Sequence, residues 1–205
     1  MKKKIFLLMI LTILLTGCSL SKLFVRENEV METLKGKHYV EMKVEGMGVI
    51  ELELDADIAP ITVTNFINLC NNNFYDGLTF IRAQKGFVIQ GGDPSSVYGK
   101  EDVKPIKGEF DANGVDNNIS HVRGVISMAR TSEYNSASSQ FFIVTDDSAV
   151  SSLDHYYAGF GKVIKGMDIV DKIEDLSKYS TDSMGFLDEE YQPVIEYAKV
   201  INVEE

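Results

Sequence analysis

Apolar and polar side chains alternate along two short runs of the chain, one on each side of a glycine-containing turn at residues 46–48. The alternating apolar residues are Val40, Met42 and Val44 in the first run and Ile50, Leu52 and Leu54 in the second. Successive side chains of a strand point to opposite faces, so a period of two places each set on one face. The pattern predicts a β-hairpin over residues 39–54 with one buried face.

Two other segments have the spacing of amphipathic helices. The first begins near Pro60, because proline is favoured at the first helical position, and ends at the asparagines of residues 71–73. Its apolar residues stand at i, i+3, i+4 and i+7: Val63, Phe66, Ile67 and Cys70. The second covers residues 167–176 and turns four residues inward: Met167, Val170, Ile173 and, less regularly, Leu176. This spacing predicts a helix at each place.

Six further runs have the character of strands. They are residues 78–83, 87–90, 124–129, 140–145, 157–163 and 194–203. With the hairpin they make about eight strands that follow one another with few crossover helices, which favours antiparallel pairing. Closing a sheet on itself removes its exposed edges. We therefore expect a mostly β fold, a closed eight-stranded antiparallel β-barrel capped by two α-helices.

The chain opens with a basic start and a short apolar run. Lys2-Lys3-Lys4 precedes an apolar stretch from Ile5 to Leu15. This stretch is typical of a secretory signal peptide and is too short to cross about 30 Å of hydrocarbon, which takes roughly 20 apolar residues. The sequence Leu15-Thr16-Gly17-Cys18 resembles the lipobox of bacterial lipoproteins. That resemblance implies cleavage before Cys18 and acylation of Cys18; the alternative is an ordinary signal peptide with an incidental cysteine.

These features predict three parts of the chain. Residues 1–17 are a lipoprotein signal peptide, residues 18–37 are a polar, lipid-anchored tether, and residues 38–205 are one domain. The expected location is extracytoplasmic, with the domain anchored to a bacterial cell membrane through the acylated Cys18. Acylation would leave Cys70 as the one remaining thiol, so no internal disulfide could form.

Charge and composition exclude several classes of function. Removing the first 17 residues takes away three lysines and no acid, which leaves 17 basic against 31 acidic side chains, a net charge of −14. Nucleic acid is not an expected partner, because such binding needs Lys and Arg to neutralise phosphates. The three histidines, His38, His121 and His155, have no metal-ligand spacing, so neither a metal nor another cofactor is expected.

Three runs of sequence carry candidate chemistry. They are Phe80-Ile81-Arg82 with Gly86 to Asp93, Gly124 to Arg130 with Ser138 to Ile143, and Leu153 to Val163. In the first run, strand patterning alone would also explain Phe87 and Val88 as core residues and Arg82 as a surface cation. Taken together and in this order, the runs resemble the cyclophilin family of peptidyl-prolyl isomerases. The resemblance covers residues 39–203, nearly the whole predicted domain.

The resemblance implies a function and a set of site residues. It makes Arg82 the catalytic guanidinium and makes four residues the walls of a proline pocket: Phe87, Val88, Phe142 and Leu153. It also places residues along the groove that holds the substrate backbone: Gln90, Ala129 and Gln140, with Tyr157 where many members carry histidine. The implied activity is peptidyl-prolyl cis-trans isomerisation by a monomer, acting on proline-containing unfolded or extended segments of exported proteins.

This sequence departs from the family at two places. The segment Ser95 to Asp102 has one glycine where relatives have a glycine-rich stretch, which bears on substrate preference. Arg130 replaces a more neutral residue beside the groove, so it is either a reader of acidic flanking residues or an ordinary surface arginine. The acidic stretch from Asp168 to Glu190 is interpreted as a solvated helix face and loop.

Two other classes of function compete with the isomerase. A proline-binding scaffold or chaperone module with incidental turnover would use the same pocket, but binding alone hardly needs a guanidinium, so the presence of Arg82 favours the enzyme. A hydrolase is disfavoured because the chain lacks a Gly-x-Ser-x-Gly elbow and a histidine placed to activate a serine.

Overall fold

The computed structural model describes residues 32–180 and 182–202. The predicted signal peptide, Cys18 and most of the predicted tether lie outside the described residues. The first described residues already contact the domain. The Leu34 amide donates to Thr64 Oγ1 and the Gly36 amide donates to Asp57 Oδ1, both at 2.8 Å. The end of the predicted tether is therefore bound to the turn and helix that follow the hairpin.

The predicted hairpin is confirmed. Strand β1 (Lys37–Val44) pairs antiparallel with β2 (Gly48–Asp55), in register from Lys37 opposite Asp55 to Val44 opposite Gly48. All six alternating apolar side chains are fully buried, as a period of two requires: Val40, Met42, Val44, Ile50, Leu52 and Leu54.

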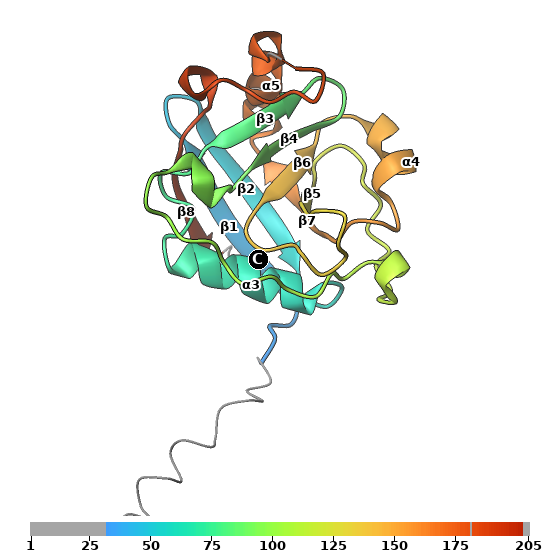
Figure 1. Cartoon of the computed structure of the whole chain (residues 1–205). Coiled ribbons are helices and arrows are strands. Elements are labelled where there is room, and N and C mark those ends of the chain that lie inside the picture. The colour runs from blue at the N-terminus through green and yellow to red at the C-terminus, as the bar shows by residue number, and fades with distance from the viewer. Residues whose placement is uncertain (1–31, 181, 203–205) are drawn as a thin grey trace, which may run out of the picture. The chain divides into compact units, whose positions relative to one another are not determined.

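Both predicted helices are present. Helix α3 (Pro60–Asn71) begins at its proline and buries the four residues of its apolar stripe. Helix α5 (Met167–Glu174) continues as a 3₁₀ segment, Asp175–Tyr179, in place of its predicted last turn. A third helix, α4 (Val150–Leu153), was not predicted, because four residues are too few to show a helical period. Figure 1 shows α3 and α5 at opposite ends of the curled sheet.

Each of the six other predicted runs overlaps a strand, although the boundaries differ by a few residues. These are β3 (Phe80–Gln84), β4 (Val88–Gly91), β5 (Val125–Met128), β6 (Phe141–Val144), β7 (Gly159–Lys165) and β8 (Ile195–Ile201). The strands form one eight-stranded sheet in the order β3-β4-β6-β5-β7-β2-β1-β8, and every neighbouring pair is antiparallel. The fold is therefore mostly β, with eight antiparallel strands in a curled half-barrel and helices at its ends.

A fully closed barrel is not confirmed. The edge strands β3 and β8 share no ladder; an isolated bridge between Thr79 and Val194 joins the segments just before them. Three hydrogen bonds lie at this bridge: the Gly77 amide donates to the Ile195 carbonyl and the Ile195 amide donates to the Leu78 carbonyl, both at 2.8 Å, and the Phe80 amide donates to the Pro193 carbonyl at 2.9 Å. The two edges therefore meet along a short junction.

The sheet separates two apolar clusters. The larger fills the curl of the sheet and contains an aromatic group: Phe66, Tyr75, Phe80, Phe141 and Phe160. The smaller is built from Val88, Val125, Phe142, Val144, Ala149 and Leu153. Because side chains alternate along β4 and β6, these strands supply residues to both clusters.

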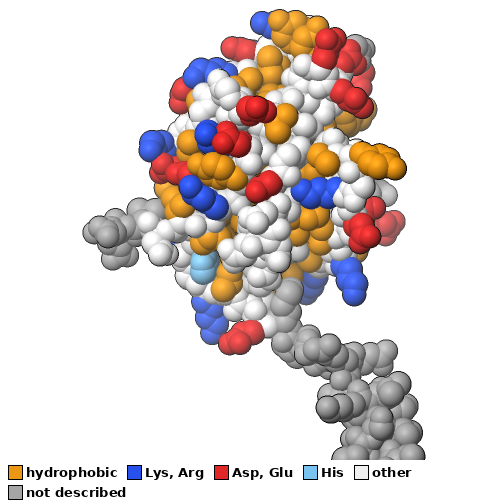
Figure 2. Space-filling model, turned by 90° about the vertical axis from the view of Figure 1, so that its left-hand side faces the viewer, with side chains coloured by type: hydrophobic (Ala, Val, Ile, Leu, Met, Phe, Trp, Pro, Cys, Tyr) orange, Lys and Arg blue, Asp and Glu red, His pale blue; other side chains and the backbone are white. Residues whose placement is uncertain are grey.

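The outer surface carries charges of both signs. Figure 2 shows one face on which acidic and basic side chains are interspersed with apolar ones. Ion pairs along the sheet include Lys43 with Glu196 and Lys199 with Glu41, both at 2.9 Å between nitrogen and oxygen. Among the described residues, no helix is both long and apolar enough to cross a membrane.

Candidate functional site

A hollow of about 210 Å³ opens on the smaller apolar cluster. Its lining residues are Arg82, Phe87, Val88, Gln90, Ala129, Arg130, Phe142, Leu153 and Tyr157. Eight of these were predicted from the sequence, and Arg130 is the addition. The ninth predicted residue, Gln140, does not line the hollow but donates and accepts hydrogen bonds one layer behind it. The fold thus brings residues from distant parts of the chain to one place.

The floor and one wall of the hollow are apolar. Val88 from β4, Phe142 from β6 and Leu153 from the end of α4 are 1%, 4% and 5% exposed. The ring of Tyr157 meets that of Phe142 edge to face, with 5.6 Å between the centroids and 82° between the planes. This geometry is favourable for aromatic pairs and fixes the orientation of both rings. The result is a rigid apolar slot with Arg82 at its rim.

The Arg82 guanidinium is held by three acceptors. Its Nε donates to the carbonyl oxygen of Met184 at 2.5 Å, and its Nη1 donates to Gln90 Oε1 at 3.2 Å. Its Nη2 donates to the side-chain oxygen of Gln84. A guanidinium has five N–H groups. Within the described residues, the other two, on Nη1 and Nη2, make no hydrogen bond and are available to a ligand.

The charge of Arg82 is maintained beside the apolar slot. Partial burial lowers the pKa of Arg82 from its usual value, while the nearby Asp182 carboxylate opposes this change. Arginine is not deprotonated in proteins. The guanidinium is therefore a fixed cation, and its Cζ lies 5.8 Å from the centroid of the Phe87 ring.

A chain of side-chain amides leads away from Arg82. Gln90 accepts from Arg82 through Oε1 and donates through Nε2 to Gln140 Oε1 at 2.9 Å. Gln140 in turn donates to Asp93 Oδ2 at 3.0 Å. Each amide is thereby oriented by its neighbours, so Gln140 acts on the hollow through Gln90.

Arg130 lies among aromatic rings at the edge of the hollow. Its guanidinium carbon lies 5.0, 5.2 and 4.6 Å from the ring centroids of Phe110, Tyr134 and Tyr157. Its Nε and Nη2 donate to the Tyr156 carbonyl at 3.1 and 2.8 Å, and its Nη1 donates to the Thr131 carbonyl at 2.9 Å. Arg130 is thus held among three rings, where it supports Tyr157.

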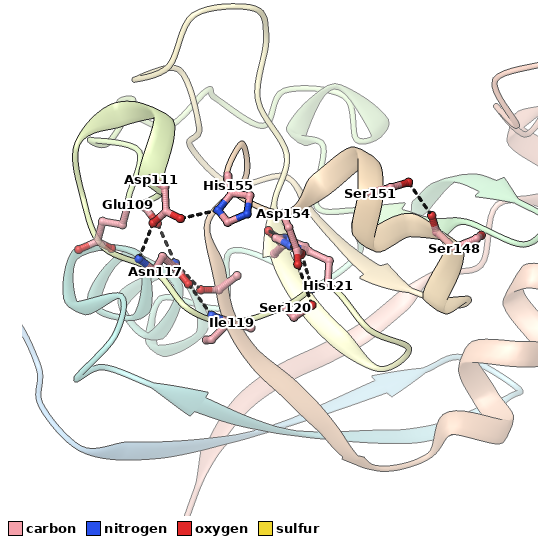
Figure 3. Close-up of polar contacts among 12 residues, drawn as sticks. Glu109, Asp111, Asn117, Ile119, Ser120, His121, Ser148, Ser151, Asp154 and His155 are labelled. Carbon is pink, nitrogen blue, oxygen red and sulfur yellow. Dashed lines mark hydrogen bonds and ion pairs between the residues drawn. The ribbon is translucent and has the colours of Figure 1, made fainter.

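A buried histidine that the sequence analysis did not select lies behind the floor of the hollow. His121 is 1% exposed, and its ring stacks on Phe142 with 6.1 Å between the centroids. Its Nδ1 donates to Asp154 Oδ1 at 2.9 Å, because an ionised carboxylate can only accept, and its Nε2 accepts from the Ser127 hydroxyl at 3.0 Å. Figure 3 shows His121 beside Asp154 and Ser120. No local pattern in the sequence marks this contact.

The protonation of this pair follows from burial. Desolvation lowers the pKa of His121, although Asp154 favours the charged ring. Burial also disfavours the Asp154 carboxylate, but hydrogen bonds from the His121 amide and from Ser120 keep the pKa of Asp154 below its usual value. His121 is therefore neutral at pH 7, and it links the Phe142 wall to the residue that follows Leu153.

The hollow contains no group suited to covalent catalysis. The side chains that line it are apolar residues, an amide, a tyrosine and two arginines. In the part of the chain that the structure describes, no three His, Cys, Asp or Glu side chains are placed to bind a metal ion together. The arrangement can bind a small apolar ring and donate hydrogen bonds from a cation to an acceptor next to it.

Comparison with known proteins identifies close similarity in sequence. The family described as "Cyclophilin type peptidyl-prolyl cis-trans isomerase/CLD" matches residues 39–200. The peptidyl-prolyl cis-trans isomerase A of Dickeya dadantii is 45% identical over 162 residues, which cover 75% of this chain and 80% of the relative. A peptidyl-prolyl cis-trans isomerase of Acinetobacter baylyi is 46% identical over 141 residues, covering 67% of this chain and 72% of the relative.

Solved structures have the same architecture. The crystal structure of a cyclophilin type peptidyl-prolyl cis-trans isomerase from Cryptosporidium parvum has a TM-score of 0.67 and 26% sequence identity, covering 82% of this chain and 99% of that one. A second structure of the same protein, in the presence of the dipeptide Ala-Pro, has a TM-score of 0.66 and 27% identity, covering 80% and 99%.

Proposed function

The chain belongs to the cyclophilin family of peptidyl-prolyl cis-trans isomerases, and on that premise we propose that the hollow beside Arg82 is its catalytic site. The chain catalyses cis-trans isomerisation of peptidyl-prolyl bonds. The observation that carries the assignment of the site is the Arg82 guanidinium, held by three acceptors at the rim of an apolar slot. The relative crystallised in the presence of Ala-Pro supports a proline-containing peptide as the ligand.

The reaction needs no bond to be made or broken. Rotation about an X-Pro amide crosses a barrier of about 18–20 kcal/mol, because conjugation between nitrogen and carbonyl is lost at the twisted geometry. A catalyst must therefore bind the twisted amide more tightly than either planar form. This requirement agrees with a hollow that has a cation and apolar walls but no nucleophile.

Arg82 would stabilise the twisted amide. As conjugation is lost, the proline nitrogen recovers its lone pair and becomes a hydrogen-bond acceptor. The two N–H groups of Arg82 that make no hydrogen bond to the described residues can donate to this nitrogen and to the neighbouring carbonyl. Since the guanidinium is already fixed by Met184 and two glutamines, it needs little reorganisation when the substrate twists.

The apolar slot would clamp the proline ring while the other side of the amide turns. Acceleration by five decades would need about 7 kcal/mol of differential stabilisation, at 1.36 kcal/mol per decade. One charge-assisted hydrogen bond contributes about 1.5–3 kcal/mol. The clamp formed by Phe87, Val88, Phe142 and Leu153 must therefore supply much of the remainder.

The test of this site is isomerisation of a short X-Pro peptide by the purified full chain. We expect Arg82→Ala to lower kcat/KM about 10–150-fold, the equivalent of one charge-assisted hydrogen bond. The matched control is Arg123→Ala, since Arg123 pairs with Asp171 away from the hollow and its loss should leave the rate unchanged. Equal rates for Arg82→Ala and the unmodified chain would remove the catalytic assignment and leave a proline-binding module.

We further propose that the enzyme acts outside the cytoplasm on exported proteins, anchored by an acylated Cys18. The support is the sequence alone: the lysines at positions 2–4, the apolar run that follows them and the lipobox-like Leu15-Thr16-Gly17-Cys18. Several acyl chains on one cysteine would hold the protein stably at a membrane. Metabolic labelling with a fatty acid should mark the intact chain and not Cys18→Ser; label retained by the variant would contradict the anchor.

A further inference from the structure

A loop from the acidic C-terminal stretch lies along the outer edge of β3, next to Arg82. The Ala83 amide donates to the Gly185 carbonyl at 2.8 Å, and the Leu187 amide donates to the Ile81 carbonyl at 2.9 Å. Gly185 has φ +88°, and a Cβ there would lie 2.7 Å from the Ala83 carbonyl oxygen. The close approach of this loop to the strand that carries Arg82 therefore requires glycine.

The loop contributes one of the three acceptors that hold Arg82. This is the Met184 carbonyl, 2.5 Å from Arg82 Nε, from a residue 102 positions further along the chain. The other two acceptors are side chains of glutamines. A backbone carbonyl has fewer degrees of freedom than a side-chain amide, so its position depends on the conformation of the loop.

One carboxylate fixes that conformation. Asp182 Oδ1 accepts hydrogen bonds from three successive backbone amides, those of Met184, Gly185 and Phe186, at 2.9, 2.8 and 3.2 Å. Hydrogen bonds from amides to a carboxylate are charge-assisted and therefore stronger than neutral ones. The Asp182 backbone is held as well, because the Ser180 hydroxyl donates to its carbonyl at 2.9 Å.

We propose that Asp182 is a positioning residue for Arg82, which acts by folding the 182–187 loop so that the Met184 carbonyl binds Arg82 Nε. Fixing Nε sets the plane of the guanidinium and thereby directs the N–H groups of Nη1 and Nη2. Asp182 does not contact the substrate in this role. The inference rests on the proposed function of Arg82, and its test separates the two.

The first experiment compares two substitutions at Asp182 in the full chain. Asp182→Ala removes the acceptor, and we expect it to lower kcat about tenfold with little change in KM, because a misplaced catalytic group costs rate. Asp182→Asn keeps an Oδ1 acceptor without the charge and should stay within about threefold of the unmodified chain. Asp188→Ala removes a charge from the same exposed segment, where Asp188 makes no capping hydrogen bond, and should have no effect.

The second experiment is a double-mutant cycle with Arg82→Ala. If Asp182 acts through Arg82, Asp182→Ala should cause no further loss in the Arg82→Ala background. A tenfold loss in both backgrounds, or no loss in either, would overturn the positioning role while leaving Arg82 catalytic. An unchanged rate for Arg82→Ala alone would instead overturn the proposed function.

A direct measurement covers the case in which Asp182→Ala is less stable. Gly185→Ala keeps Asp182 but forces the loop away from β3, and it should give the same loss of kcat. The Nε–H signal of Arg82 in the nuclear magnetic resonance spectrum should exchange faster with water in both variants. A slow, unshifted Nε–H signal in Asp182→Ala would contradict the inference.

Discussion

At the scale of single residues, the site depends on the shape of a guanidinium as much as on its charge. Arg82 donates hydrogen bonds in three directions, to Met184, Gln90 and Gln84, and these bonds fix its planar guanidinium beside the hollow. A lysine has one nitrogen at the end of a flexible stem and cannot reproduce this fork. Charge without the fork should therefore be insufficient.

Arg82→Lys tests this requirement. We expect kcat/KM to fall nearly as far as in Arg82→Ala, by about 10–150-fold, because the ammonium cannot be held by three acceptors while donating to the substrate. The measurement is isomerisation of an X-Pro peptide, with Arg123→Lys as the matched control. A lysine variant with the rate of the unmodified chain would show that a point charge suffices.

Two histidines should make opposite contributions to stability as the pH changes. Burial lowers the pKa of His121 below 6.5, so the unfolded chain binds the proton more readily and the contribution of His121 is lost as the pH falls below 6.5. The hydrogen bond to Asp111 raises the pKa of His155 above 6.5, so its contribution is lost as the pH rises through that higher pKa.

Urea unfolding between pH 5 and pH 8 measures both contributions. The difference in unfolding free energy between the unmodified chain and His121→Gln should shrink toward pH 5. For His155→Gln the difference should shrink toward pH 8. Curves for both variants that run parallel to the curve of the unmodified chain would contradict the assignment of the two pKa directions.

At the scale of elements, adjacent residues of β4 have different roles, one in the stability of the core and the next in the activity of the site. Ile89 belongs to the large core and Val88 to the small cluster under the hollow, and both are at most 1% exposed. Their side chains point to opposite faces of the sheet. Substitutions one residue apart should therefore have different consequences.

Ile89→Ala and Val88→Ala form a matched pair. Ile89→Ala should lower the unfolding free energy by about 2–5 kcal/mol and leave kcat/KM per folded molecule unchanged. Val88→Ala should cost less stability, because it removes two carbon atoms where Ile89→Ala removes three, but it should lower kcat/KM by loosening the clamp on proline. Denaturant titration and peptide isomerisation check the pair, and equal loss of kcat/KM in both would contradict the division.

The sequence predicted those elements whose pattern is local. The alternation in residues 39–54 and the stripe from Val63 to Cys70 predicted the hairpin and α3, because period and burial are coupled within one element. Boundaries differed by a few residues, as for the run 87–90 and the strand Val88–Gly91. The contact of the Met184 loop with Arg82 could not be predicted, since it joins residues 102 positions apart and leaves no periodic signal.

The site residues show the same difference between what the sequence could indicate and what only the folded chain brings together. Arg82, Phe142 and Leu153 were named from the resemblance to a family, and the structure brings them to one hollow. His121 was considered only as a possible metal ligand and was not selected. Its stacking on Phe142 depends on the approach of β6 to the segment before β5, which only the folded sheet determines.

At the scale of the whole molecule, the thiol of Cys70 reports on global unfolding. Cys70 lies in the large core, is 2% exposed and is the free cysteine among the described residues. Burial raises the pKa of its thiol, which suppresses the reactive thiolate. Reaction with a thiol reagent should therefore require the core to open.

Labelling of the full-length Cys18→Ser variant tests this expectation, because Cys70 is then its one thiol. In native buffer the modification should be far slower than for a free cysteine. Its rate should rise with urea in parallel with unfolding followed by circular dichroism. Rapid labelling in the absence of urea would show a local opening that exposes α3.

The alternation along β4 and β6 also has a consequence for how such an enzyme can diversify. Odd-numbered side chains on these strands, such as Ile89, Phe141 and Ile143, belong to the large core, and even-numbered ones, such as Val88, Phe142 and Val144, belong to the small cluster. Mutations that adapt the enzyme to new client proteins can therefore accumulate at the even-numbered positions of these strands. Purifying selection for folding acts on the odd-numbered positions. A lineage could change its specificity in this way without passing through unfolded ancestors.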